Sequence, residues 1–225
     1  MGLFLRDNSF FTEDHEGVLH ALEEFWTTEG HRLAFLSAEE HDSHDAYTLF
    51  TGWNGWTQLS WTRGWEWDLR RRAQLHVSRA LGCPGLLTFV HDGDMWGYEL
   101  FDAGVVLDQF VHWCDPTDFF PGKDTTGRPE ILVAAFPALS LDLRHAAGYL
   151  SPFPEDEEDE LAWDTHVRPG DRWTRGNALV FEDFWRFLGI TEPRQGQHGR
   201  IVMPAPVWRR FTVETDRKRR TARST

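Results

Sequence analysis

Residues 86–113 constrain the fold more than any other stretch, because they contain three consecutive apolar runs separated by two short turns. The first turn is Asp92-Gly93-Asp94 and the second is Asp102-Ala103-Gly104. Aspartate and glycine favour tight turns, whereas runs rich in β-branched and aromatic residues favour strands. The stretch therefore predicts three strands in succession. Large apolar side chains occupy alternate positions over 96–100, so we expect one face of the middle strand in the core and the other in water.

Amphipathic patterns on both sides of this stretch predict helices, because apolar residues recur at intervals of three and four. Gly82 and Pro84 follow one of these segments, as expected for a helix end. The predicted helices cover residues 14–28, 67–81, 127–139, 142–150 and 177–188. Residues 32–37 predict a further strand, and residues 47–61 predict two strands joined by an Asn54-Gly55 turn. This order of elements predicts an α+β fold with a mainly antiparallel sheet flanked by helices.

Length and composition predict one domain. The chain has 225 residues, of which 40% are hydrophobic, enough to bury a sizeable core. The segment 151–160 mixes prolines with consecutive acidic residues, which indicates a solvated loop. We therefore expect a single α+β domain over 1–215 with an acidic loop at 151–160, followed by a basic flexible tail at 216–225.

The charge and cysteine content limit the partners and the compartment that we expect. The formal net charge is −13, and binding to a nucleic-acid backbone needs clustered cations, so we expect a basic protein partner and no nucleic acid. Only Cys83 and Cys114 are present, which is typical of a reducing compartment. The sequence shows no secretory signal and no run of about 18 apolar residues. We therefore predict a cytoplasmic protein without a membrane span.

Tryptophan is unusually abundant, with twelve residues. An indole is costly to leave in water, so these side chains either form an aromatic core or bind another molecule. Trp56, Trp61 and Trp65 are the candidate binding residues. Trp56 and Trp65 adjoin glycines, and we expect these two to be exposed. An exposed aromatic platform suits a protein partner or, as an alternative function, a carbohydrate.

Two groups of histidine and aspartate offer possible metal ligands. His41, His44 and Asp45 lie within a short polar segment, and imidazole with carboxylate is a usual ligand set for zinc or iron. His91, Asp92 and Asp94 follow the first strand of the central stretch, where the carboxylates could hold a divalent cation. Such a site would make the protein a metal-dependent hydrolase or transferase. Turn formation explains both groups more simply, so we favour that reading and keep Asp92 and Asp94 only as candidate binding residues.

No other motif indicates catalysis. The chain lacks a nucleophile elbow and a glycine-rich phosphate loop, and Cys83 precedes Pro84 in a context typical of a structural thiol. We therefore predict no cofactor and no resident metal, and we favour a protein that is not an enzyme.

Two segments, one in the central stretch and one near residue 185, share residues with other proteins: His91, Asp92, Asp94, Tyr98, Leu100, Phe101, Gly104, Leu107, Asp108, Phe181, Asp183, Phe184, Trp185, Leu188 and Gly189. In these residues the chain resembles uncharacterised bacterial proteins with immunity-protein-like architecture. The resemblance implies a small intracellular α+β protein, for which binding or neutralising another protein is a common role. Our leading hypothesis is thus a non-catalytic acidic module that binds a basic partner.

Overall fold

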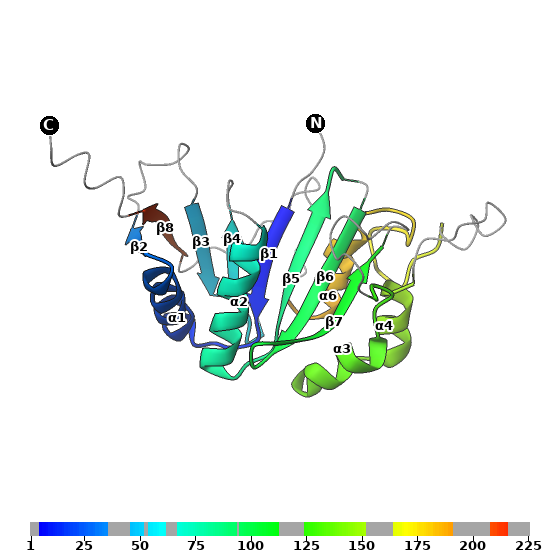
Figure 1. Ribbon diagram of the computed structural model, residues 1–225. Coiled ribbons are helices and arrows are strands. Elements are labelled where there is room, and N and C mark those ends of the chain that lie inside the picture. Colours follow the sequence, from blue (N-terminus) through cyan, green and yellow to red (C-terminus); the bar gives the residue numbers. More distant parts are fainter. Residues whose placement is uncertain are drawn as a thin grey trace, which may run out of the picture. The chain divides into compact units, whose positions relative to one another are not determined.

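The computed structural model describes residues 5–35, 46–51, 54–61, 67–93, 95–112, 124–151, 164–190 and 208–215. It confirms the predicted α+β fold with an antiparallel sheet and helices (Figure 1). The chain divides into two compact units, each treated separately below. Unit 1 comprises Met1–Arg6, Leu86–Phe101 and Val106–Pro204, and unit 2 comprises Asp7–Gly85, Asp102–Val105 and Ala205–Thr225. Our expectation of a single α+β domain over 1–215 stays a prediction.

Unit 2 contains a five-stranded antiparallel sheet in the order β2-β8-β3-β4-β1. Its strands are β1 (Leu5–Phe10), β2 (His31–Phe35), β3 (Ala46–Thr51), β4 (Thr57–Trp61) and β8 (Trp208–Thr215). The last strand of the chain therefore lies between two strands from its first quarter. The sequence did not predict β8. It is rich in charged residues, and its position depends on pairing with β2 and β3, which are distant in the sequence.

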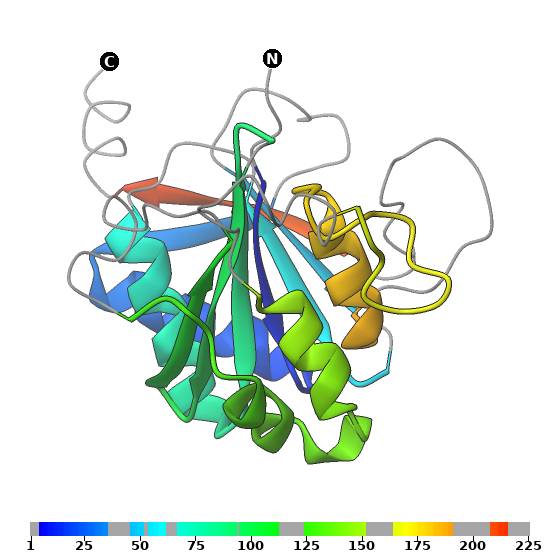
Figure 2. The ribbon, with the colours of Figure 1, turned by 90° about the vertical axis from the view of Figure 1, so that its right-hand side faces the viewer.

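Two helices lie side by side on one face of this sheet, α1 (His15–Thr28) and α2 (Trp67–Leu81) (Figures 1 and 2). Both match the predicted helices. Asp14 caps α1, because its side chain accepts a hydrogen bond from the Gly17 backbone N–H at 2.9 Å. The buried side of α1 carries residues that recur at intervals of three and four: Val18, Leu19, Ala21, Leu22, Phe25 and Trp26. Burying this apolar stripe leaves the opposite, polar side of α1 exposed.

Unit 1 contains the predicted strands in the order β5-β6-β7, with bounds β5 (Gly85–His91), β6 (Met95–Asp102) and β7 (Val105–Val111). The expectation that one face of β6 is in water was wrong, because every residue from Trp96 to Phe101 is buried. Even Glu99 is fully buried, and it accepts a hydrogen bond from the Gln109 side chain at 2.6 Å. Periodicity revealed the apolar positions of β6, but it could not show that the polar positions between them are covered as well.

The helices of unit 1 are α3 (Pro129–Ala135), α4 (Leu143–Tyr149) and α6 (Val180–Phe187), with a short 3₁₀ helix, η2 (Pro137–Leu139), after α3. Each begins within three residues of its predicted start. Helix α6 packs on β6, where the rings of Phe184 and Tyr98 stack with centroids 5.7 Å apart. Phe184 also contacts Trp96 of β6 and Tyr149 of α4. This aromatic cluster joins α4 and α6 to β6.

The free side of β7 in unit 1 is covered by residues 125–127. The Val111 N–H donates to the Thr125 carbonyl at 3.0 Å, and the Gly127 N–H donates to the Gln109 carbonyl at 3.1 Å. Next along the chain, Arg128 donates to the carboxylate of Asp108, which also accepts from the Tyr98 hydroxyl at 2.7 Å. Covering strand edges in this way prevents unwanted pairing with other chains.

Candidate functional site

The residues proposed from sequence as metal ligands do not form a site in the described part of the chain. His91 ends β5 and is exposed, and Asp92 is exposed in the following turn. Asp92 and Gly93 have φ values of 52° and 80°, as a tight hairpin turn requires. His41, His44, Asp45 and Asp94 lie outside the described residues. Within the described ranges, no group of three or more His, Cys, Asp or Glu side chains is arranged to hold a metal ion.

The tryptophans whose side chains are described belong mainly to the core. Trp56 is only 1% exposed, so our expectation that it is exposed was wrong. The Asn54–Gly55 turn, in which both residues have positive φ, directly precedes Trp56. The indole ring of Trp56 lies against the ring of Phe11, with centroids 5.0 Å apart. For Trp61 the structure describes only the backbone in β4, and Trp65 lies outside the described residues. Trp26, Trp96 and Trp185 are also fully buried.

A small, shallow pocket lies in the described part of unit 1. Its lining residues are His112, Gly148, Tyr149, Ser151, Val167, Arg175 and Val180. The Arg175 guanidinium donates to the Gly148 carbonyl at 3.1–3.2 Å and to the Ser151 hydroxyl at 2.7 Å. These hydrogen bonds, made by polar groups that line the pocket, connect α4 to the segment that leads into α6.

His112, which lines this pocket, is neutral. Its Nε2 lies 2.9 Å from the Arg175 carbonyl, which can only accept, so Nε2 carries the proton. Burial lowers the pKa of His112 to about 4, although the hydrogen bond to the Arg175 carbonyl acts in the opposite direction. A neutral imidazole that donates to a backbone carbonyl positions the chain, and a pKa near 4 suits it poorly to proton transfer at neutral pH.

Two carboxylates, those of Asp183 and Asp171, also fix this segment. Asp183 accepts hydrogen bonds from the backbone N–H groups of Arg172 and Trp173 at 2.9 and 2.8 Å, and it also pairs with Arg186. Asp171 accepts from the Tyr149 hydroxyl at 2.7 Å and from the Arg168 N–H at 2.8 Å. Charged groups of this segment therefore organise the loop, which favours an architectural role for the pocket.

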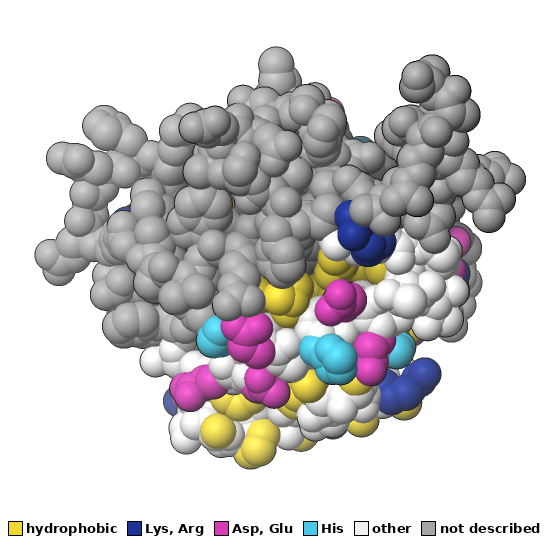
Figure 3. All heavy atoms as spheres, turned by 90° about the vertical axis from the view of Figure 1, so that its left-hand side faces the viewer, with side chains coloured by type: hydrophobic (Ala, Val, Ile, Leu, Met, Phe, Trp, Pro, Cys, Tyr) yellow, Lys and Arg dark blue, Asp and Glu magenta, His cyan; other side chains and the backbone are white. Residues whose placement is uncertain are grey.

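The outer side of α1 is a stronger candidate for contact with another molecule. Three exposed carboxylates of α1, those of Glu16, Glu23 and Glu24, lie on one side of this helix, and the exposed Glu13 lies just before its N-cap; we call these four the acidic face. Side chains that are three, four or seven residues apart share one side of a helix. Helix α1 contains no lysine or arginine. Figure 3 shows Asp, Glu and His side chains gathered on this side of the molecule.

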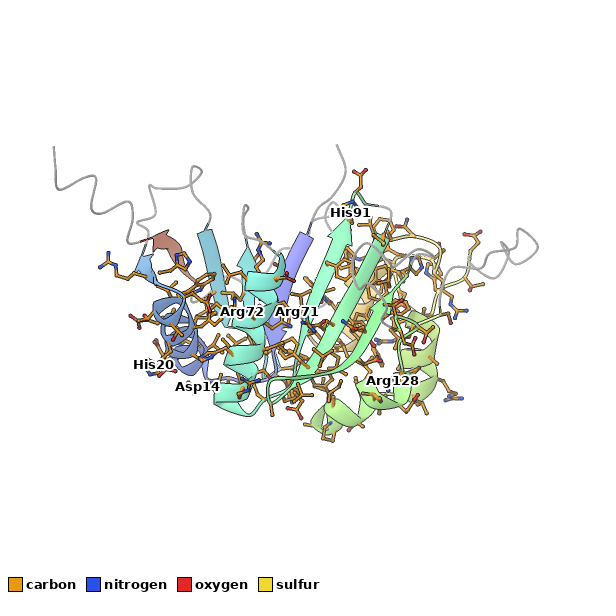
Figure 4. The ribbon with its side chains drawn as sticks, viewed as in Figure 1. Asp14, His20, Arg71, Arg72, His91 and Arg128 are labelled. Atoms are coloured by element: carbon orange, nitrogen blue, oxygen red, sulfur yellow. The ribbon has the colours of Figure 1, made fainter. Side chains whose placement is uncertain are left out.

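Histidines stand within and beside the acidic face. His20 projects from the outer side of α1, as Figure 4 shows, and its Nε2 lies 3.4 Å from Oε1 of Glu24. The other carboxylate oxygen of Glu24 lies 3.9 Å from Nε2 of His76 on α2. Near the start of the helix, Nε2 of His15 lies 3.7 Å from Glu16. Imidazoles thus adjoin two of the four carboxylates.

Arg72 of α2 pairs with Glu29, which is outside the acidic face, and its guanidinium lies 5.8 Å from the centre of the Phe25 ring. The sequence carried a signal for this surface, because Glu16, His20 and Glu24 are spaced at intervals of four on a predicted helix. Our sequence reasoning used only the apolar side of α1 and missed it.

Comparisons with known proteins found no match for this chain. No family model matches the chain, and neither does any curated protein or solved structure. None of the described helices is both long and apolar enough to cross a membrane.

Proposed function

We propose that this protein is a non-catalytic acidic module that binds a partner protein with a basic surface, in the manner of an immunity or inhibitor protein that neutralises its target. The observation that supports the proposal is the acidic face, with three exposed carboxylates on one side of a helix that has no lysine or arginine and a fourth just before its N-cap. A surface of one sign attracts a partner of the opposite sign and raises the rate of encounter.

The contribution of such a surface to the free energy of binding has an upper limit. An exposed ion pair contributes about 0.2–1 kcal/mol, so four of them contribute a few kcal/mol at most. Charge alone would thus give selectivity and fast association, and tight binding would need additional apolar contacts from elsewhere. No observation in the described ranges favours the alternatives of a metal-dependent enzyme or a carbohydrate-binding module, which stay untested predictions.

The test separates the acidic face from the net charge of the whole protein. In the full chain, Glu16→Gln with Glu23→Gln removes two charges from the face and keeps good helix formers. We expect this double variant to bind a fluorescent oligolysine peptide about tenfold more weakly than the unaltered protein at low salt, because each exposed pair contributes about 0.7 kcal/mol. Fluorescence anisotropy measures the dissociation constant.

The control removes two exposed carboxylates from unit 1, with Glu130→Gln and Asp164→Asn, so the total charge change is the same. We expect this control to weaken peptide binding less than about twofold, because it leaves every carboxylate of the acidic face in place and lowers only the net charge of the protein. Equal weakening by both double variants, or no peptide binding by the unaltered protein, would contradict the proposal.

A further inference from the structure

We propose that the histidines around the acidic face make binding of a basic partner depend on pH, so that acidification releases the partner. This inference rests on the proposed function, because it concerns the regulation of the same surface. It is supported by a specific arrangement, in which the Glu24 carboxylate lies between His20 of its own helix and His76 of the neighbouring helix, at 3.4 and 3.9 Å.

The groups that face His20 are carboxylates of its own helix. Glu24 lies one turn after it and Glu16 one turn before it, and Glu23 shares the same side of α1. The His20 side chain is 73% exposed, so a proton can reach it without any opening of the fold. Once protonated, His20 places a positive charge in the middle of the surface that attracts a cationic partner.

His76 reaches the acidic face from α2. From α1, it faces the Glu24 carboxylate and the ring of Phe25, whose centroid lies 5.8 Å from that of the imidazole. On its own helix, Arg72 lies one turn earlier and pairs with Glu29. Protonated His76 would compete with the partner for Glu24, because the carboxylate is already within ion-pair distance of the imidazole.

The third imidazole, His15, is 32% exposed and lies beside Glu16. An ordinary imidazole gains its charge between about pH 8 and pH 5, a range in which ordinary carboxyl groups stay mostly ionised. Protonation of all three imidazoles would change the formal charge of the four carboxylates and three imidazoles from −4 to −1. Such a change would remove most of the attraction for a cationic partner.

The experiment measures oligolysine binding by the full chain at about pH 7.5 and about pH 5.5, on either side of the range in which imidazole titrates. We expect the unaltered protein to bind about tenfold more weakly at the lower pH, since it loses the equivalent of two or three exposed ion pairs. A triple variant, His15→Gln, His20→Gln and His76→Gln, should change less than about threefold over the same interval. Circular dichroism at both pH values verifies that each protein stays folded.

The control is His91→Gln, which removes an exposed histidine from unit 1 and should keep the full pH effect. Two outcomes would overturn the inference alone, namely binding by the unaltered protein that does not change with pH, or a triple variant that loses binding as strongly as the unaltered protein. If the unaltered protein fails to bind the peptide at about pH 7.5, where imidazole is mostly neutral, both the proposed function and this inference fail.

Discussion

Asp7 of β1 has a buried carboxyl group, and its burial destabilises the fold when the group is ionised. Cross-strand partners share one face of a sheet, and the register places Asp7 opposite Ser60 and Ser9 opposite Gln58. Asp7 is only 3% exposed, and burial raises its pKa to about 6, although a hydrogen bond with the Ser60 side chain acts in the opposite direction. The ionised form of Asp7 is therefore less stable in the folded protein than in the unfolded chain.

The sign of the resulting pH dependence follows from this raised pKa. Below the ordinary value of 3.8, Asp7 is protonated in both states and costs nothing, whereas above about 6 it is ionised in both and the full penalty applies. We predict that Asp7→Asn increases the free energy of unfolding by about 2–3 kcal/mol near pH 8 and changes it little near pH 4. Urea unfolding at the two pH values measures both quantities. An equal gain at both values would contradict the burial of an ionised group.

At the scale of elements, the turn between β6 and β7 contains a strained residue. Ala103 and Gly104 have φ values of 46° and 79°, which allow a two-residue hairpin turn but disfavour a side chain with a Cβ atom. Asparagine tolerates this conformation better than alanine does. We predict that Ala103→Asn raises the free energy of unfolding by about 0.5–1 kcal/mol, as measured by urea unfolding.

The neighbouring position supplies a control of opposite sign. A Cβ atom at Gly104 would lie 2.6 Å from the Cβ of Arg79 and 2.9 Å from the Leu75 carbonyl oxygen. Gly104→Ala should therefore destabilise the protein by at least about 1 kcal/mol, because it adds a steric clash to the backbone strain. If both substitutions change stability in the same direction, strain at Ala103 is not the controlling factor.

The sequence predicted elements well where the deciding interactions are local. Helical spacing in α1 and α2 and the turn chemistry of Asp92-Gly93 act over a few residues. It failed for β8, whose strand partners β2 and β3 are far away in the chain. It failed at Trp56 and Glu99 for a related reason, since burial depends on what covers a side chain and not on its immediate neighbours.

At the candidate site, too, the sequence indicates features that depend on near neighbours but not those that depend on packing between distant segments. The carboxylates of the acidic face could be read from the helical spacing of Glu16, Glu23 and Glu24. The position of His76 beside Glu24 depends on the packing of α2 against α1, which no pattern within either helix specifies. The metal and tryptophan sites were proposed because suitable residue types are close together in the sequence. In the structure, Asp92 forms a tight turn and Trp56 is buried in the core, so both residues have a structural role.

At the scale of the whole molecule, two buried groups respond to pH in opposite ways. Asp7 lies in unit 2 and His112 lies in unit 1. The lowered pKa of His112, about 4, means that its neutral form stabilises the fold above the ordinary value of 6.5, and this stability is lost as the pH falls toward 4. Protonation of Asp7 stabilises the fold over much of the same interval. Each effect amounts to about 3 kcal/mol, so they nearly offset one another in a molecule that unfolds as a whole.

This opposition tests our prediction of a single domain. If the chain unfolds in one cooperative step, we expect calorimetry to show a single transition, to which Asp7 and His112 together contribute a change of less than about 1 kcal/mol between pH 6.5 and pH 4. Over that interval, Asp7→Asn should then make the protein lose stability relative to the unaltered chain, and His112→Gln should make it gain. If the two units unfold separately, two transitions should diverge on acidification, because unit 2 gains stability from Asp7 while unit 1 loses it at His112. Two diverging transitions would therefore refute the single domain, whereas one transition whose pH dependence responds to both substitutions would establish that the units fold together.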